Sequence, residues 1–428
     1  MIAAIAAARA GAVVTLLERN DRLGKKLLAT GNGRCNLSNR NFQHQDLTDQ
    51  NPEKEDFARL AYDMLPLAES LEFLHDLGIY HREESSGRLY PYSEQAASVL
   101  DSLRMELEHA SVKVVPDSRV DQIRKERSKS GGERFLVRDG QGRTFQADRL
   151  ILATGGMAGP QYGSLGDGYL LATSFGHSLI APKPILVQMT SDRTFFPQLK
   201  GVRSKAKVSL LQSKRDKGEN RISVIAREEG EVQFTETGLS GICIFDLSRA
   251  MQHQIQQAEE VHGDKKRLPQ KSVSHSRYLV SIDFMPELSL EKLEQMLSKR
   301  SRELGHRTIE YFLQGLLNKK LVPVLLRECG IAVQQQVHAI TGAQLSKLSA
   351  ILKDWRIPVT GTRSWEDAQV TAGGIPVTEV RGDTMESRKI PGLYLAGELL
   401  DLDGKCGGYN LQWAWTSGIL AGRNAARV

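Results

Sequence analysis

The first 18 residues carry the pattern that most limits how this chain can fold. Ile2 to Ala10 is rich in alanine and favours a helix, and Gly11 follows where a helix C-cap glycine belongs. Val13 to Leu17 is a continuous apolar, β-branched run, typical of a buried parallel strand, and it ends in Glu18. This order predicts the second half of a nucleotide-binding βαβ unit, in which the acid accepts hydrogen bonds from ribose hydroxyls.

The glycine fingerprint of such a unit lies about 20 residues before its acid. Counting back from Glu18 places those glycines before Met1. We therefore expect this chain to lack the first strand and its glycine turn. The alternative is that Glu18 merely begins a surface loop after an ordinary strand.

The segment after Glu18, Arg19 to Asn39, combines turn residues with cations. Gly24, Gly31 and Gly33 are interspersed with asparagines, lysines and an arginine. Such a loop presents backbone N–H groups and positive charge to an anionic or electron-accepting ligand. A plain glycine-rich connector is the alternative.

The C-terminal region repeats the strand-then-acid pattern. Gly392 to Glu398 reads as a short buried strand ending in Gly-Glu, and a glycine-rich turn through Gly407 and Gly408 leads into a helix expected over Trp413 to Ala426. An acid at a strand end can bind ribityl hydroxyls, and a helix N-terminus can stabilise the reduced flavin. We expect both aromatic residues at the start of this helix to pack in the core, with at most one near a ligand.

The middle of the chain supplies the remaining parts of the domain. Leu60 to Leu77 is expected to be one surface helix and Ala96 to Glu108 another. Asp148 to Gly156 reads as a buried strand closing on small residues, where larger side chains would clash with a dinucleotide. Further short strands are expected at Val112 to Val115, Arg119 to Arg124, Arg134 to Arg138, Thr144 to Ala147 and Ala368 to Ile375.

Glu18 to Asn39 and the Gly397 to Gln412 string resemble a family of bacterial NAD(P)/FAD-dependent oxidoreductases, called aminoacetone-oxidase-like or BaiN-type flavoproteins. Gly87 to Ser93 resembles that family's G-R-x-F-P-x-S element, and the resemblance covers nearly all 428 residues. It implies an α/β fold: a Rossmann-like FAD-binding domain of the two-dinucleotide-binding flavoprotein type, with an inserted β-barrel-like and helical region.

The same resemblance implies FAD as cofactor, NAD(P)H as a candidate electron donor, and hydride or electron transfer to an unidentified small organic substrate. No catalytic acid or base is singled out. The expected cofactor-binding residues are Glu18, Lys25, Lys26, Thr30, Gly31, Gly33, Arg34, Cys35, Asn36, Val120, Ala153, Thr154, Gly155, Gly156, Gly397, Glu398, Gly407, Gly408, Tyr409, Asn410, Leu411 and Gln412.

A chain of 428 residues exceeds what one hydrophobic core usually supports, so several domains are expected. Strand-like segments at Ile185 to Thr190, Lys207 to Leu211, Val232 to Thr235 and Leu279 to Asp283 suggest an antiparallel barrel or sheet. The expected division is a FAD-binding domain at 1–185 and 363–428, a β-rich insert at 186–285 with a polar excursion at 251–276, a helical subdomain at 286–352, and a return to the β-rich domain at 353–362.

The composition limits which partners, such as nucleic acids, metals and membranes, we expect for this chain. The net charge of +6 is scattered and aromatics are only 6%, so we expect no nucleic-acid partner. Four widely spaced cysteines fit neither a zinc site nor disulfides, which favours a reducing cytoplasm and no metal. No run approaches the roughly 20 apolar residues of a membrane helix. A truncated non-catalytic remnant and a flavoprotein acting on tRNA remain as alternatives, and the oligomeric state is open.

Overall fold

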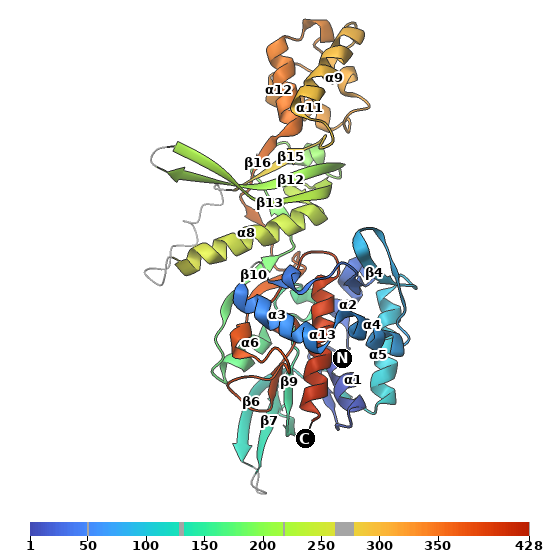
Figure 1. The fold of residues 1–428 in the computed structure, drawn as a ribbon, viewed down its shortest axis with the longest axis vertical. Coiled ribbons are helices and arrows are strands. Elements are labelled where there is room, and N and C mark those ends of the chain that lie inside the picture. Colours follow the sequence, from blue (N-terminus) through green and yellow to red (C-terminus); the bar gives the residue numbers. More distant parts are fainter. Residues whose placement is uncertain (49–50, 128–131, 217–218, 262–277, 428) are drawn as a thin grey trace. The chain divides into compact units, whose positions relative to one another are not determined.

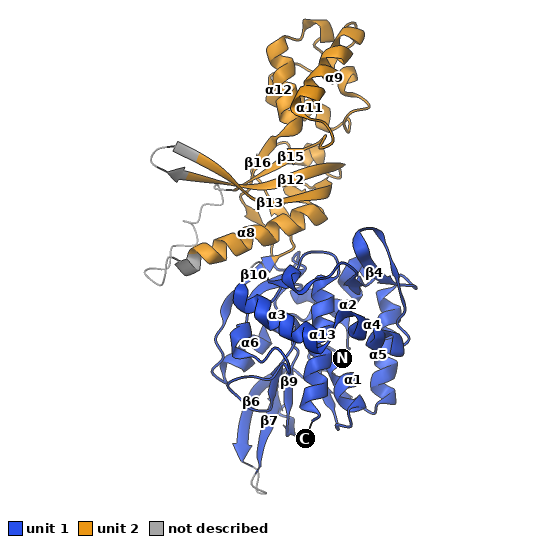
Figure 2. Ribbon diagram, viewed as in Figure 1, with its two compact units in different colours: residues 1–184, 365–428 blue, residues 185–364 orange. Residues whose placement is uncertain are grey.

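The computed structural model describes residues 1–48, 51–127, 132–216, 219–261 and 278–427. The chain divides into two compact units, residues 1–184 with 365–428 and residues 185–364 (Figure 1, Figure 2). Unit 1 therefore combines the two ends of the chain, and unit 2 is inserted between them.

The N-terminal pattern folds as a helix followed by a parallel strand. Helix α1 spans Ile2–Arg9, and β1 (Thr15–Leu17) pairs in parallel with β5 (Lys113–Val115). The expectation of a strand buried from Val13 onward is wrong, because Val13 is fully exposed and β1 is only partly buried. Because β1 pairs with one strand only, this two-stranded ladder leaves part of the apolar segment uncovered.

The second parallel pair of unit 1 brings the middle of the chain to its C-terminal region. Strand β9 (Leu150–Leu152) pairs with β19 (Leu393–Leu395). A three-stranded antiparallel meander, β6 (Val120–Arg127), β7 (Glu133–Asp139) and β8 (Thr144–Ala147), leads into β9. Strand β10 (Ile180–Ile185) pairs with β18 (Val370–Gly374).

Helices and a small sheet complete the N-terminal half of unit 1. The helix expected over Leu60 to Leu77 is instead two, α3 (Pro52–Met64) and α4 (Leu67–Asp76), because Pro66 disfavours helical backbone at Leu65. The remaining elements are α2 (Lys25–Ala29), α5 (Ala96–His109), α6 (Asp167–Thr173) and a sheet in the order β2 (Ser38–Asn39), β4 (Arg88–Pro91), β3 (His81–Glu83).

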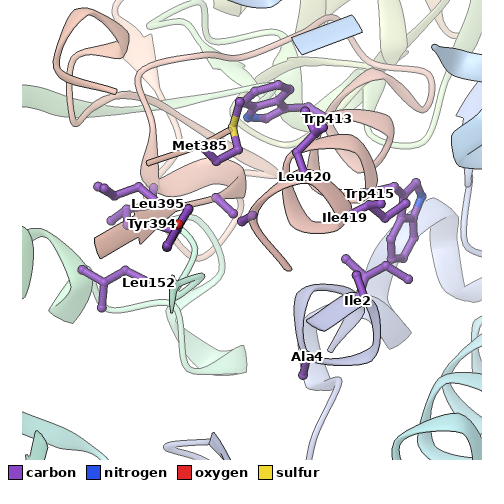
Figure 3. Packing of buried hydrophobic residues seen from close by; sticks show 14 of the residues in the cluster. Ile2, Ala4, Leu152, Met385, Tyr394, Leu395, Trp413, Trp415, Ile419 and Leu420 are labelled. Carbon is purple, nitrogen blue, oxygen red and sulfur yellow. The ribbon is translucent and has the colours of Figure 1, made fainter. Parts of the chain in front are cut away.

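The C-terminal helix α13 packs closely on α1. It spans Tyr409–Ala425, starting four residues earlier than expected. A Cβ on Gly422 would lie 2.3 Å from the Ala3 carbonyl oxygen, so only glycine permits this approach. Figure 3 shows Ile2 of α1 beside α13, whose Trp413 and Trp415 are 1% and 5% exposed. Both tryptophans therefore belong to the core.

Unit 2 is built on a seven-stranded antiparallel sheet in the order β16-β15-β12-β13-β14-β11-β17. Ile185 to Thr190 is not one strand, because the backbone turns left-handed at Leu186, with φ 51°, between β10 and β11. The strand bounds are β11 (Met189–Thr190), β12 (Arg203–Asp216), β13 (Glu219–Phe234), β14 (Gly238–Ser240), β15 (Tyr278–Asp283), β16 (Trp355–Pro358) and β17 (Gly361–Thr362).

The polar excursion expected at 251–276 is wrong over its first part. Helix α8 spans Ile242–Val261, because Ile244, Leu247, Met251 and Ile255 form an apolar stripe at helical spacing that packs in the unit 2 core. Residues 262–276 lie outside the described part. Helices α9 (Leu290–Glu303), α10 (Ile309–Leu313), α11 (Leu321–Cys329) and α12 (Gly342–Lys353) follow.

Candidate cofactor and active site

Glu18 lies where β1 ends, next to the start of α1. Its Oε1 accepts hydrogen bonds from the backbone and side-chain nitrogens of Asn20, at 2.8 and 2.9 Å. Burial lowers the pKa of the Met1 amine, whereas the Glu18 carboxylate raises it, so the N-terminal end of α1 lies near this acid. A strand-end carboxylate beside a helix N-terminus is the arrangement that holds a dinucleotide.

The ends of β9, β18 and β19 meet at a second glutamate. Glu398 Oε1 accepts a 2.7 Å hydrogen bond from the Thr371 backbone nitrogen. The Thr371 hydroxyl in turn accepts from the nitrogens of Met157 and Ala158, at 2.9 and 3.0 Å. A Cβ on Gly156 would lie 2.4 Å from that hydroxyl, so the small residues after β9 are needed for this approach. Thr371 was not singled out from the sequence, where its only signal was its place two residues before a double glycine.

Three glycines of the expected site have left-handed backbone and free space where a side chain would point. No heavy atom lies within 4 Å of a Cβ built on Gly33 (φ 84°) or Gly397 (φ 73°). On Gly155 (φ 73°), only a serine hydroxyl is near, at 4.0 Å. The Gly397 turn is fixed, since its nitrogen donates to Ser417 Oγ at 2.9 Å and its oxygen accepts from Trp413 Nε1 at 3.2 Å. A rigid turn with an open Cβ position is a suitable cradle for a cofactor.

The cations expected to face a ligand are already paired. Lys26 Nζ donates to Glu398 Oε2 at 2.7 Å, and Lys25 pairs with Asp21 at 2.5 Å. The guanidinium of Arg34 pairs with Glu84. The Lys26 contact joins α2, in the segment after β1, to the residues that follow β19, so it brings two of the expected site segments together.

The start of α13 is a glycine turn pressed against β2. Gly408 is the N-cap, with φ 103°, and a Cβ there would lie 2.3 Å from the Ser38 carbonyl oxygen. The Asn39 side chain donates to the Gly407 carbonyl at 3.1 Å. Asn36 Oδ1 is buried without a hydrogen-bond partner, 2.9 Å from the Gly408 Cβ position. This unpaired acceptor beside a helix N-terminus is a polar atom that a bound group can satisfy.

The residues after Gly408 mainly hold the turn and the helix in place. The Asn410 amide closes the turn through Gly404, at 2.8 and 2.9 Å. Gln412 is fully buried and bonds Ser38, Ser70 and Thr416. The Tyr409 ring lies 5.7 Å from that of Phe42, and Leu411 packs against the core.

Cys35 and Cys406 differ in environment. Cys35 is fully buried, and burial raises its pKa to about 11, so it stays a thiol at neutral pH. Its partner Thr30 donates a hydroxyl bond to the Leu27 carbonyl at 2.6 Å. Cys406 is partly exposed, and its sulfur lies 3.8 Å from the Gln369 side-chain oxygen. All four cysteines are free thiols.

The other expected residues lie next to β9, at the start of β6 and beside β4. Ala153 and Thr154 are exposed directly after β9, and Val120 begins β6 half-buried. A Cβ on Gly31, with φ 57°, would lie 3.3 Å from the Tyr90 ring. Tyr90 and Arg88, on β4, were not among the predicted site residues, although both lie in the Gly87 to Ser93 segment that resembles the family's G-R-x-F-P-x-S element.

Two strand-end glutamates, rigid open glycines and a glycine-started helix on an α/β framework together define a FAD-dependent oxidoreductase of the Rossmann type. The particular family follows from comparison with known proteins. The chain matches the family described as "HI0933-like protein Rossmann domain" over residues 1–424, and it belongs to that family.

Curated relatives span nearly the same length. The chain is 39% identical over 428 residues to a 3-dehydro-bile acid delta(4,6)-reductase of Clostridium scindens, covering 100% of this chain and 96% of the relative. It is 28% identical over 417 residues to the ribosomal RNA dihydrouridine synthase of Escherichia coli, covering 97% and 93%. The protein of that name from Haemophilus influenzae is 27% identical over 422 residues, covering 98% and 94%. The predictions of family, fold class and flavin-dependent oxidoreductase activity are confirmed.

Across the described ranges, no helix combines the length and apolar character needed to cross a membrane.

Proposed function

We propose that this protein reduces a carbon–carbon double bond conjugated to a ketone in a polycyclic, steroid-like acid, with FAD as cofactor and NAD(P)H as electron donor. The two relatives' names share this chemistry. A delta(4,6)-reductase acting on a 3-dehydro bile acid saturates a bond conjugated to a carbonyl, and making dihydrouridine saturates the ring bond conjugated to a uracil carbonyl. The higher identity to the bile acid enzyme favours the steroid-like substrate.

The observation that carries the proposal is the meeting of β9, β18 and β19 at Glu398, beside the open turn at Gly397. In this assignment Glu18 takes the adenosine ribose, Glu398 takes the ribityl chain, and the start of α13 faces the flavin ring. FAD supplies hydride transfer when it is bound. The backbone amides at the Gly408 N-cap stabilise negative charge on the reduced ring.

The carboxylate of Glu398 is also held in place by other residues of the proposed site. Its two oxygens are held by Lys26 and by the Thr371 nitrogen, so the carboxylate is fixed before any ligand arrives. Fixing an acceptor in advance lowers the entropic cost of ordering a flexible chain on it. We therefore assign Lys26 to positioning Glu398 rather than to direct contact with the flavin.

The test begins with the purified chain and added FAD. We expect a bound flavin band near roughly 450 nm, as for any oxidised flavin, bleaching by NADH or NADPH, and its return when a 3-oxo-4,6-diene bile acid is added. Glu398→Gln should weaken FAD binding, whereas Glu236→Gln, an exposed carboxylate of unit 2, should not. Protein that stays colourless with excess FAD contradicts the cofactor site. Bound flavin that the diene never reoxidises contradicts the substrate class.

A second candidate is a flavoenzyme acting on RNA. Two relatives carry the name ribosomal RNA dihydrouridine synthase, and the chain has a net charge of +6, so the expectation of no nucleic-acid partner is weakened. An RNA substrate requires salt-dependent binding, because Lys and Arg release counterions from phosphates. Submicromolar binding of a ribosomal RNA fragment that weakens steeply with salt would favour this candidate over the steroid. Location in the cytoplasm likewise remains part of the proposal.

A further inference from the structure

Four arginines lie at the small sheet formed by β2, β4 and β3. Three of them form ion pairs with glutamates, whereas Arg88 acts on Glu84 only through its charge, which helps to lower the pKa of that carboxyl. Within the described ranges, the Arg88 guanidinium makes no ion pair and no hydrogen bond, although it is half-buried. A half-buried cation without a partner is costly to keep, which suggests a role in binding an anion or a developing negative charge. The other three pair with glutamates: Arg34 with Glu84, Arg40 with Glu83, and Arg82 with Glu94.

Arg88 and Tyr90 are two residues apart on β4, so their side chains share one face. Arg88 Nε lies 3.6 Å from the position of a Cβ on Gly407, at the start of α13. The Tyr90 ring lies 3.3 Å from the corresponding position on Gly31. Both side chains therefore lie beside glycine turns expected to bind the cofactor, and the Gly407 turn begins the helix whose start we assign to the flavin ring.

The Tyr90 ring is held in a fixed position. The Arg34 guanidinium carbon lies 4.1 Å from the ring centroid, and Arg34 is itself tied to Glu84. Burial raises the pKa of the Tyr90 hydroxyl, an effect that the charges of Arg88 and Arg34 oppose without cancelling it. The hydroxyl is therefore protonated at neutral pH and can donate. In the described part of the chain it makes no hydrogen bond.

A separate observation marks the same place as a ligand site. Asn36 Oδ1 is buried without a partner beside Gly408, and Asn36 as a whole is only 9% exposed. An orphaned buried acceptor next to an unpaired cation and an unpaired hydroxyl leaves three polar groups that the protein does not satisfy by itself.

We propose that Arg88 and Tyr90 together donate hydrogen bonds to the carbonyl oxygen of the conjugated ketone and so form a donor pair. This inference rests on the proposed function. FAD, when bound and reduced, would supply a hydride to the far carbon of the double bond, and the π electrons would then move onto this oxygen. A cation and a hydroxyl set in advance stabilise that charge. The α-carbon would take a proton from water and the carbonyl would re-form, so that the former double bond carries one hydrogen added as hydride and one added as a proton.

The test compares Arg88→Met and Tyr90→Phe with Arg40→Met, a neighbouring arginine that is exposed and paired. Tyr90→Phe restores the phenylalanine of the G-R-x-F-P-x-S pattern, so the fold should tolerate it. The probe is a 3-oxo-4,6-diene bile acid labelled with ¹³C at the carbonyl, bound to the oxidised holoenzyme. Isotope-edited infrared spectra report how strongly the protein polarises the carbonyl, without turnover.

We expect the wild-type protein and Arg40→Met to lower the carbonyl stretch of the bound probe. The two site variants should lose most of that shift and about 100-fold in kcat, with FAD content unchanged. An unaltered shift and kcat in both site variants, with the wild type active, overturns the donor pair alone. A wild type that holds FAD yet neither binds nor reduces the probe overturns the substrate class, and with it this assignment.

Discussion

Replacing Gly397 with alanine should separate the stability of the fold from its hold on the cofactor. Gly397 has φ 73°, and an alanine in the left-handed region costs roughly 1–2 kcal/mol. No heavy atom lies within 4 Å of the new methyl group, so the free energy of unfolding should fall by no more than this strain. If FAD occupies that space, the methyl group overpacks the complex by about 1–3 kcal/mol, which is roughly a 5- to 150-fold rise in Kd for FAD.

Gly78, which follows α4, supplies a matched control. Its φ is 77°, its Cβ position is equally open, and it is exposed outside the proposed site. Urea unfolding of flavin-free protein should show a similar loss of stability for Gly78→Ala and Gly397→Ala. Titration with FAD, followed by flavin fluorescence, should show weaker binding for Gly397→Ala only. Equal FAD affinities in the two variants would refute the placement of the cofactor over Gly397.

Three further predictions concern the framework of unit 1. Burial by itself would raise the pKa of Glu379, but hydrogen bonds from neighbouring groups lower it to about 2. The stability that this carboxylate contributes should therefore be present above about pH 4.5 and be lost as the pH falls toward 2. Urea unfolding should show a loss of up to about 3 kcal/mol over that range. Gly422→Ala should destabilise by about 1–3 kcal/mol, because its methyl group would meet the Ala3 carbonyl at 2.3 Å. Lys54→Met should cost about 3–5 kcal/mol, because it leaves the Asp401 carboxylate, 3% exposed, without its 2.8 Å partner.

Controls distinguish these effects from general damage. Glu379→Gln should flatten the acid limb of the stability profile, and an unchanged limb would contradict the role of this carboxyl. Gly342→Ala, at an open position in α12, should be neutral or stabilising by up to about 1 kcal/mol, opposite in sign to Gly422→Ala. Adding Asp401→Asn to Lys54→Met should recover much of the loss, and strict additivity of the two would contradict the buried pair.

The sequence determined the elements and their chemistry. An alanine-rich helix, a strand tipped by Glu18 and a glycine turn before a long helix are local patterns, and each is specified by residues close together in the chain. The FAD-dependent class was implied by the resemblance of the Glu18 to Asn39 and Gly397 to Gln412 segments to a flavoprotein family, and the two acid-tipped strands agree with it. A local feature of the sequence, Pro66, also determines the break between α3 and α4, because proline disfavours helical backbone at the residue before it.

Only the tertiary structure decided which side chains remain available to a ligand. Lys26, Arg34 and Gln412 looked equally suited to a cofactor in the sequence, yet each is satisfied by a partner that lies 50 or more residues away. Arg88 lies in the Gly87 to Ser93 element, but nothing in the sequence separated it from the arginines nearby. In the structure it stands out because those arginines form ion pairs with glutamates and it does not. Charge pairing depends on distances between segments remote in sequence, and those distances are fixed by packing, not by local pattern.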